Sequence, residues 1–312
     1  MRVILRAVFG LKDGPRYQRL ERLLGAMLDR MSNPLSVSLL YFPTLRQDFG
    51  PLSPWGSFVR VRQQIDQLIY DEIAERRTHP DASRNDILTL LMSARDEAGE
   101  ALTDAELRDE LITLLMAGHE TTATAITWAL YWIHKFPTVR NQLLNELQAL
   151  DAPLDFSTLF RLPYLNAVCC ETLRIYPVVM ATFARVTKSP IELMGSSLKP
   201  GTIVVGCIYL AHRREDVYPD PDEFRPERFL ERHYSPFEYL PFGGGVRRCI
   251  GMAFAQFEMK LVISGILSGF ELALADSRSV RPVRRGLTSG PSPFRMVVKE
   301  HRPTKLVRTP SD

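Results

Sequence analysis

Apolar residues recur at helical spacing along most of the chain, and one segment carries this pattern much further than the others. Over residues 103–135, Thr103 and Glu106 form a capping box at the start, and Pro137 stops the helix after its end. At about 1.5 Å per residue such a helix is about 50 Å long. Its part from Leu111 to Ile133 is long enough to span a membrane, but Glu120 lies in the middle, where an acid costs roughly 2–3 kcal/mol or more in lipid. The pattern therefore predicts a buried central helix of a globular protein.

The remaining pattern predicts a helical first half and a mixed second half. Further helices are expected over residues 3–11, 16–31, 55–77, 86–95, 138–150, 163–175 and 250–267. Short strands are expected over residues 183–186, 191–193, 202–208, 270–274 and 295–299. Proline-rich loops are expected over residues 33–54 and 218–226. With no repeat and no convincing linker, we predict one α-rich domain over residues 1–312 with a minor β part.

Composition excludes several classes of protein. Apolar residues make up 45% of the chain and charged residues 24%, which suits a globular protein with a sizeable core. The net charge of +3 comes without a long Lys/Arg run, so nothing supports nucleic-acid binding. The cysteines, Cys169, Cys170, Cys207 and Cys249, are too sparse for a disulfide scaffold and form no CxxC pair. A reducing compartment is the simpler interpretation, and the N-terminus is not a convincing signal peptide.

The strongest chemical signal is the segment FGGGVRRCIG at residues 242–251, where Cys249 lies between a glycine-rich turn and an apolar helix. Helix N-termini present free N–H groups and a partial positive charge, which favour a thiolate. The glycines let backbone amides approach the sulfur, where they can tune an iron–sulfur bond. Arg247 is placed to meet an anion. A lone cysteine after glycines is more often a buried structural residue, whereas dinucleotide and P-loop motifs fail on Arg248 and on the missing Gly-Lys-Ser/Thr.

A second signal is the segment ETLR, in which Glu171 and Arg174 lie three residues apart and share a helix face. Such a pair is usually on the solvated surface, but here the flanking residues are apolar. A pair on a half-buried helix needs further partners. Arg228, in the segment PERF at residues 226–229, is the candidate.

A third signal is the segment AGHETT at residues 117–122 of the long helix. Glycine and threonine are poor helix formers in the middle of a helix, and threonine hydroxyls can bend one. A bend beside Glu120 and Thr121 would make a polar notch for a small ligand. The alternative is a row of threonines packed between helices. A zinc protease motif is excluded because HExxH is incomplete.

In this order, AGHETT, ExxR, PERF and FGGGVRRCIG resemble the signature of the cytochrome P450 family. The cysteine loop matches the family pattern Phe-x-x-Gly-x-Arg-x-Cys-x-Gly at every fixed position. The resemblance covers roughly residues 1–300 and is most specific from 117 to 251. It implies the mainly α cytochrome P450 fold, with haem b (iron protoporphyrin IX) as the cofactor.

By this resemblance, Cys249 is the axial thiolate ligand of the haem iron, and thiolate donation favours O–O cleavage. Arg247 and Arg185 are expected to contact the haem propionates. Thr121 and Glu120 are expected to be catalytic, with Thr121 hydrogen-bonding the bound oxygen and Glu120 relaying protons. The remaining cysteines are expected to be small core residues.

The same resemblance implies further positions. The other residues expected at the haem are Phe242, Gly243, Gly251, Ala117 and Gly118. The structural triad, which locks the fold around the haem, would be Glu171, Arg174 and Arg228. Substrate contacts would lie near residues 116–121, 178–182 and 289–294, which are apolar or small and suit a hydrophobic molecule.

One departure from the family concerns the start of the chain. Full-length members have several helices before the helix that residues 1–11 resemble, and these carry propionate contacts, a substrate loop and part of the electron-donor docking face. We therefore expect an N-terminally truncated gene model, a fragment or a degenerate copy, of bacterial type. A cytoplasmic location is expected for this piece, since any N-terminal anchor would be missing from it.

The resemblance implies insertion of one oxygen atom from O2 into a C–H bond of a hydrophobic substrate. Electrons would come from a separate donor, such as ferredoxin or a flavoprotein reductase, because no flavin or iron–sulfur motif is visible. Two alternatives stay open. One is peroxide-driven hydroxylation or isomerisation without O2, which the pair Glu120 and Thr121 disfavours. The other is a non-catalytic haem binder or an inert fragment, which the missing N-terminal part favours.

Overall fold

The computed structural model describes residues 1–10, 14–32, 42, 46–48, 50, 53–81, 83–150, 156–285 and 287–302. The chain divides into two compact units, an N-terminal unit of residues 1–120 and a C-terminal unit of residues 121–312. The long helix α6 (Asp104–Lys135) contributes its first half to one unit and its second half to the other. We describe each unit by itself, and the single-domain organisation stays a prediction.

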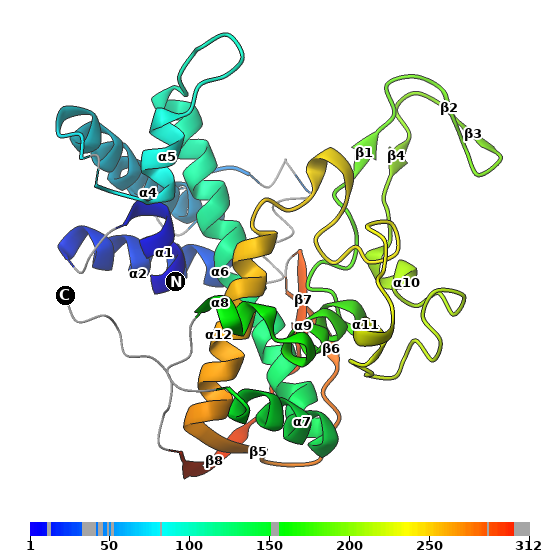
Figure 1. The fold of residues 1–312 in the computed structure, drawn as a ribbon. Helices are drawn as coiled ribbons and strands as arrows, with labels where there is room; N and C mark the ends of the chain where they lie inside the picture. Colours follow the sequence, from blue (N-terminus) through cyan, green and yellow to red (C-terminus); the bar gives the residue numbers. More distant parts are fainter. Residues whose placement is uncertain are drawn as a thin grey trace. The chain divides into compact units, whose positions relative to one another are not determined.

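The described regular elements of the N-terminal unit are helices, joined by loops that include one isolated β-bridge between Arg95 and Ala101 (Figure 1). Its helices are α1 (Arg2–Phe9), α2 (Pro15–Ser32), α4 (Pro54–Thr78), α5 (Ile87–Ser93) and the first half of α6. The predicted capping box of α6 is confirmed, because the Thr103 N–H donates to the Glu106 carboxylate at 2.8 Å and the Glu106 N–H donates to the Thr103 hydroxyl at 3.3 Å. The helices share a core that includes Leu5, Ile69 and Leu111, all fully buried.

Close packing between α1 and α6 explains one glycine of the AGHETT segment. A Cβ atom added at Gly118 would lie 2.6 Å from Cδ1 of Ile4, a buried residue of α1. No real Cβ atom tolerates that distance, so the lack of a side chain at Gly118 lets the two helices approach. Gly118 thus has a packing role inside the N-terminal unit, whereas its predicted role at the haem stays a prediction.

We expect Gly118→Ala to lower the free energy of unfolding by about 1 kcal/mol. Alanine gains about 1 kcal/mol of helix propensity over glycine, but overpacking typically costs about 1–3 kcal/mol. In an Ile4→Val background, which lacks the Cδ1 atom, the same change should be neutral or stabilising. Gly25→Ala in α2 is the matched control, because nothing lies within 4 Å of a Cβ added there. Denaturant unfolding of these variants measures the difference, and an equal effect of Gly118→Ala in both backgrounds would contradict the contact with Ile4.

The C-terminal unit has a helical core and a border of short strands (Figure 1). The second half of α6 packs with α7 (Pro137–Gln148), α9 (Pro163–Ile175) and α12 (Met252–Gly269) around fully buried apolar residues: Ala129, Leu143, Val168 and Ile263. The shorter elements are α8 (Phe156–Arg161), α10 (Ile208–Ala211), α11 (Arg228–Glu231) and the 3-10 turn η2 (Gly245–Arg247). The packed helices hold the irregular segments between α9 and α12 from one side.

The strands described in the C-terminal unit form four antiparallel pairs. These pair β1 (Arg185–Val186) with β4 (Ile203–Val204), β2 (Ile191–Leu193) with β3 (Ser196–Leu198), β5 (Phe270–Leu274) with β8 (Met296–His301), and β6 (Pro282–Arg285) with β7 (Thr288–Pro291). Figure 1 shows β2 and β3 at the tip of an arm that extends beyond β1 and β4. The pair of β5 and β8 follows α12 directly and is the longest of the four.

Most of the predicted helices are present, but several short elements differ from the prediction in type or bounds. The predicted strand over residues 202–208 is wrong beyond residue 204, because α10 begins at Ile208. Residues 289–294, predicted as a substrate loop, begin inside β7. The helix predicted from residue 250 begins at Met252, and α8, β3, β6 and β7 were not predicted. Of the proline-rich stretch 33–54, the greater part lies outside the described residues.

Two further predictions concern α6 and the cysteines. Among the described residues, no helix is long and apolar enough to cross a membrane. The helix α6 runs without a break through the AGHETT segment, and the bend predicted there stays a prediction. Cys169 and Cys170 are buried as expected, but the expectation for Cys207 is wrong, since it is exposed.

Candidate functional site

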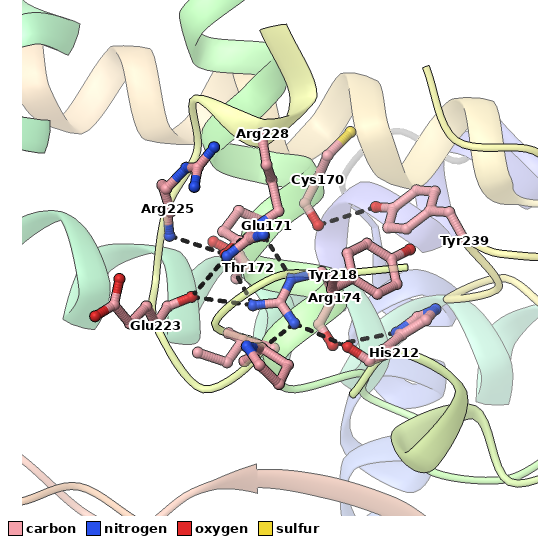
Figure 2. A network of polar contacts seen from close by, with 12 residues as sticks. Cys170, Glu171, Thr172, Arg174, His212, Tyr218, Glu223, Arg225, Arg228 and Tyr239 are labelled. Carbon is pink, nitrogen blue, oxygen red and sulfur yellow. Dashed lines mark hydrogen bonds and ion pairs between the residues drawn. The ribbon is translucent and has the colours of Figure 1, made fainter. Parts of the chain in front are cut away.

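The carboxylate of Glu171 on α9 is fully buried in the C-terminal unit (Figure 2). Arg174, one turn along the helix, donates to both of its oxygens, with Nε 2.6 Å from Oε2 and Nη2 2.9 Å from Oε1. Both side chains are fully buried. A buried carboxylate is expensive unless it is paired and hydrogen-bonded, and this bidentate pair meets that requirement.

Arg228 is the third member of the cluster. Its Nε donates to Oε1 of Glu171 at 3.1 Å, and its side chain is 2% exposed. The backbone N–H of Arg225 donates to the same oxygen at 2.8 Å. The structure therefore brings together Glu171, Arg174 and Arg228, which lie on α9 and at the start of α11.

Two guanidinium groups around one carboxylate leave an excess positive charge, which backbone carbonyls surround. All five N–H donors of Arg174 have partners, because its Nη1 reaches the carbonyls of His212 (2.9 Å) and Pro221 (2.8 Å), and its Nη2 also reaches that of Glu223 (3.1 Å). Arg228 reaches the carbonyls of Pro219 (3.0 Å) and Asp220 (3.3 Å). The cluster thus fastens the irregular segment 219–225 onto α9.

We expect Glu171→Ala to destabilise the protein strongly, because it leaves two buried guanidinium groups without their carboxylate. Breaking a buried ion pair typically costs about 3–5 kcal/mol, against a total stability of about 5–15 kcal/mol. The matched control is Glu231→Ala, which removes an exposed carboxylate that pairs with Arg225 and should change stability by less than about 0.5 kcal/mol. Thermal and denaturant unfolding measure both, and equal stability of the two variants would contradict the energetic role of the cluster.

The loop with Cys249 lies between the segment after α11 and the start of α12. Gly243 and Gly245 have φ of 69° and 62°, in the region where glycine is favoured. The N–H of Cys249 donates to the carbonyl of Phe242 at 2.9 Å and closes the loop. Gly251 is the N-cap residue of α12, so Cys249 lies just before the first turn of that helix. Its thiol is free and exposed, which contradicts the alternative of a buried structural cysteine.

The other residues predicted beside Cys249 differ in their surroundings. Arg247, in η2, is exposed, whereas the ring of Phe242 packs against the core of the C-terminal unit. Arg185, at the start of β1, is also exposed, but its Nη1 donates to the carbonyls of Phe183 (3.0 Å) and Ala184 (3.1 Å). The structure therefore turns Nη1 of Arg185 back onto the chain just before it.

The predicted residues on α6 belong to two units. Ala117, Gly118 and Glu120 lie in the N-terminal unit and Thr121 in the C-terminal unit. Ala117 is exposed, and Glu120 and Thr121 are half-buried.

An acid–alcohol contact that the sequence reasoning missed joins α6 to α12. The buried hydroxyl of Thr122 lies near the half-buried carboxyl of Glu258. Burial raises the pKa of Glu258, and the nearby Thr122 hydroxyl opposes that shift in part. The signal available in the sequence was a lone acid inside the apolar run of α12.

A comparison with protein-family models identifies the family of this chain. The model described as "Cytochrome P450" matches residues 1–298. The chain belongs to the cytochrome P450 family.

Curated relatives of this cytochrome P450 come from mycobacteria. It is 40% identical over 283 residues to the putative cytochrome P450 135B1 of Mycobacterium tuberculosis, which covers 90% of this chain and 58% of that protein. It is 37% identical over 293 residues to the putative cytochrome P450 135A1 of the same species, which covers 93% of this chain and 61% of that protein. The chain thus spans about three fifths of the length of these relatives.

Solved structures agree with the predicted fold. The haem domain of cytochrome P450DA superimposes with a TM-score of 0.80 at 28% identity, over 96% of this chain and 66% of that one. Retinoic acid-bound cyanobacterial CYP120A1 gives a TM-score of 0.78 at 28% identity, with the same coverage. The prediction of a mainly α cytochrome P450 fold with a minor β part is confirmed.

The cofactor of the family is haem, and the residues around Cys249 fit it. The thiol is free, and the loop exposes two large apolar side chains, Val246 and Ile250, which are about as exposed as in an unfolded chain. Exposed apolar side chains gathered at one place commonly mark a binding surface. A free thiol for iron, an apolar rim for a flat ring and the cation of Arg247 for a carboxylate are the chemistry that a haem requires.

Proposed function

We propose that the protein is a haem-thiolate monooxygenase that inserts one oxygen atom from O2 into a hydrophobic organic substrate. Two observations together carry the proposal: the chain belongs to the cytochrome P450 family, and its free, exposed Cys249 precedes the apolar helix α12. The bound haem would supply the iron at which O2 is activated.

The residues around Cys249 would bind and orient the cofactor. Cys249 would provide the sulfur ligand, and the N-terminal end of α12, with its partial positive charge, would stabilise the thiolate. Arg247 would pair with a propionate, and Arg185 would pair with one through the N–H groups that do not bond the carbonyls of Phe183 and Ala184. Gly243, Gly251 and Ala117 would leave room for the ring, and Phe242 would line the loop, whereas the space beside Gly118 is taken by Ile4.

Thr121 and Glu120 would handle protons. They are adjacent on α6, where both are half-buried and can therefore exchange protons with water while remaining fixed by the helix. The hydroxyl of Thr121 would donate a hydrogen bond on the substrate side, and the carboxyl of Glu120 would hold and pass a proton.

The substrate would be hydrophobic, and the electrons would come from a separate ferredoxin or flavoprotein reductase. The retinoic acid bound to one solved relative is such a molecule, an apolar chain with one acid group. We further propose a cytoplasmic location, in line with the few cysteines, which suit a reducing compartment.

Cys249→Ser should abolish the thiolate signature of the haem. The reduced carbon monoxide complex of the natural protein should show the red-shifted Soret band of thiolate ligation, and the serine variant should lose it because an alcohol is a poor donor to iron. Cys207→Ser is the matched control, since Cys207 is also free and exposed. Retention of the band in Cys249→Ser, or its loss in Cys207→Ser, would assign the ligand elsewhere.

Thr121→Ala should leave haem binding intact and divert electrons to peroxide or water, since the hydroxyl that directs protons is gone. Removing a group that positions a proton typically costs about 10²–10⁴-fold in its step. Thr127→Ala on the same helix is the control, because the Thr127 hydroxyl donates to the carbonyl of Ala123 one turn earlier, at 2.7 Å. The measurement is the ratio of product formed to electrons consumed, and normal coupling in Thr121→Ala would remove Thr121 from the mechanism.

A further inference from the structure

His212 is a buried histidine that the sequence reasoning passed over, and it lies between α9 and the segment that leads to Cys249 (Figure 2). Its Nδ1 is 3.1 Å from the carbonyl oxygen of Arg174, and its Nε2 is 2.8 Å from the backbone nitrogen of Leu240. A carbonyl can only accept and an N–H can only donate. The ring must therefore carry its proton on Nδ1 and leave Nε2 bare, which defines one neutral tautomer.

The contact with Leu240 continues into the cysteine loop through the backbone. The carbonyl of Leu240 accepts from the N–H of Gly243 at 2.9 Å, and the carbonyl of Phe242 accepts from the N–H of Cys249 at 2.9 Å. Two backbone hydrogen bonds therefore connect Leu240 to Cys249, one at Gly243 and one at Cys249 itself.

A second anchor lies directly beside the first. The hydroxyl of Tyr239 donates to the carbonyl of Cys170 on α9 at 3.1 Å. The ring of Tyr239 also stacks on that of His212, with centroids 5.6 Å apart and planes 20° apart. The backbone just before the cysteine loop is therefore held against α9 at two adjacent residues.

The surroundings of His212 keep its ring neutral. Burial lowers the pKa of His212 from the ordinary 6.5 to about 4; the hydrogen bond to the Arg174 carbonyl opposes this shift in part, and the guanidinium groups of Arg174 and Arg213 contribute to it. The other ionisable groups at the ring are the phenols of Tyr218 and Tyr239. A proton on Nε2 would remove the acceptor of the Leu240 N–H, so the neutral state is the one that holds the loop.

We propose that His212 is a positioning residue whose single tautomer clamps Leu240 to the end of α9 and thereby fixes the loop that presents Cys249 to the haem. The clamp itself is a property of the chain, whereas its purpose rests on the function proposed above. Arg174 takes part in both structures, because its side chain holds Glu171 while its carbonyl orients His212.

The first test needs no haem chemistry. Nitrogen NMR of the full protein, with labelled histidine, reports which ring nitrogen of His212 carries the proton. We expect the Nδ1–H tautomer at neutral pH, with protonation only near pH 4. The Nε2–H tautomer, or a charged ring at pH 7, would overturn the proposal.

The second test compares substitutions at His212. His212→Phe removes both ring contacts, whereas His212→Gln can still offer an oxygen to the Leu240 N–H. His134→Phe is the matched control, since the Nδ1 of this half-buried histidine contacts only the Leu130 carbonyl of its own helix among the described contacts. Hydrogen exchange at the amides of Leu240 and Cys249 should quicken about tenfold or more in His212→Phe, and much less in the other two.

The spectroscopic readout connects the clamp to the cofactor. The thiolate-type Soret band of the carbon monoxide complex should fall in His212→Phe, recover in His212→Gln and stay intact in His134→Phe. If the natural protein lacks this band, the proposed function fails, while tautomer and exchange still decide the clamp. If the natural protein shows this band, then an unchanged band together with unchanged Leu240 exchange in His212→Phe overturns the clamp.

If His212→Phe does not fold, the same comparison is made with His212→Gln. Rapid exchange of the Leu240 amide in that variant would count against the role of the side chain as its acceptor.

Discussion

The structure of the C-terminal unit depends on one carboxylate, that of Glu171, buried between two guanidinium groups. A buried carboxylate is tolerable only with full pairing, and here its two oxygens accept four N–H donors from Arg174, Arg225 and Arg228. The excess positive charge then needs acceptors of its own. These are carbonyls of residues 219–223, a segment without helix or strand. The backbone carbonyls of this irregular segment find hydrogen-bond donors because the arginines supply the N–H groups that a helix or sheet would otherwise provide.

The loop with Cys249 also depends on contacts with α9. Positive φ at Gly243 and Gly245 gives that loop its shape, and glycine makes such a shape accessible at the cost of a larger loss of entropy on folding. Backbone hydrogen bonds within the loop close it, as between the Cys249 N–H and the Phe242 carbonyl. It is held through the residues before it, since Tyr239 and Leu240 are fastened to the carbonyls of α9 directly and through His212. Helix α9 therefore supports both the cluster around Glu171 and the cysteine loop.

The sequence could predict what depends on local signals. The length of α6, its capping box and the glycine loop before α12 follow from spacing and residue type within a few positions, and the structure has each of them. The contacts of His212, Tyr239 and Glu258 could not be predicted in the same way, since each joins residues far apart in the chain. The strand expected up to residue 208 failed for a related reason. Apolar and β-branched residues there suit a strand, but tertiary packing buries Ile208 at the start of α10.

Gly118 shows how far a motif and its physical reason can differ. In a sequence, a small residue beside an acid and an alcohol on a long helix points towards a ligand. In the structure, the space next to Gly118 is filled by Ile4 of α1, so the residue is required for helix packing whatever lies on the neighbouring faces of α6. Adjacent helical residues point about 100° apart, so Ala117 faces a different direction from Gly118. Ala117 and Thr121 are four residues apart and therefore share one face of α6. Ala117 is the small residue on the face that carries the Thr121 hydroxyl. The AGHETT segment thus combines a packing face at Gly118 with a second face that carries Ala117 and Thr121.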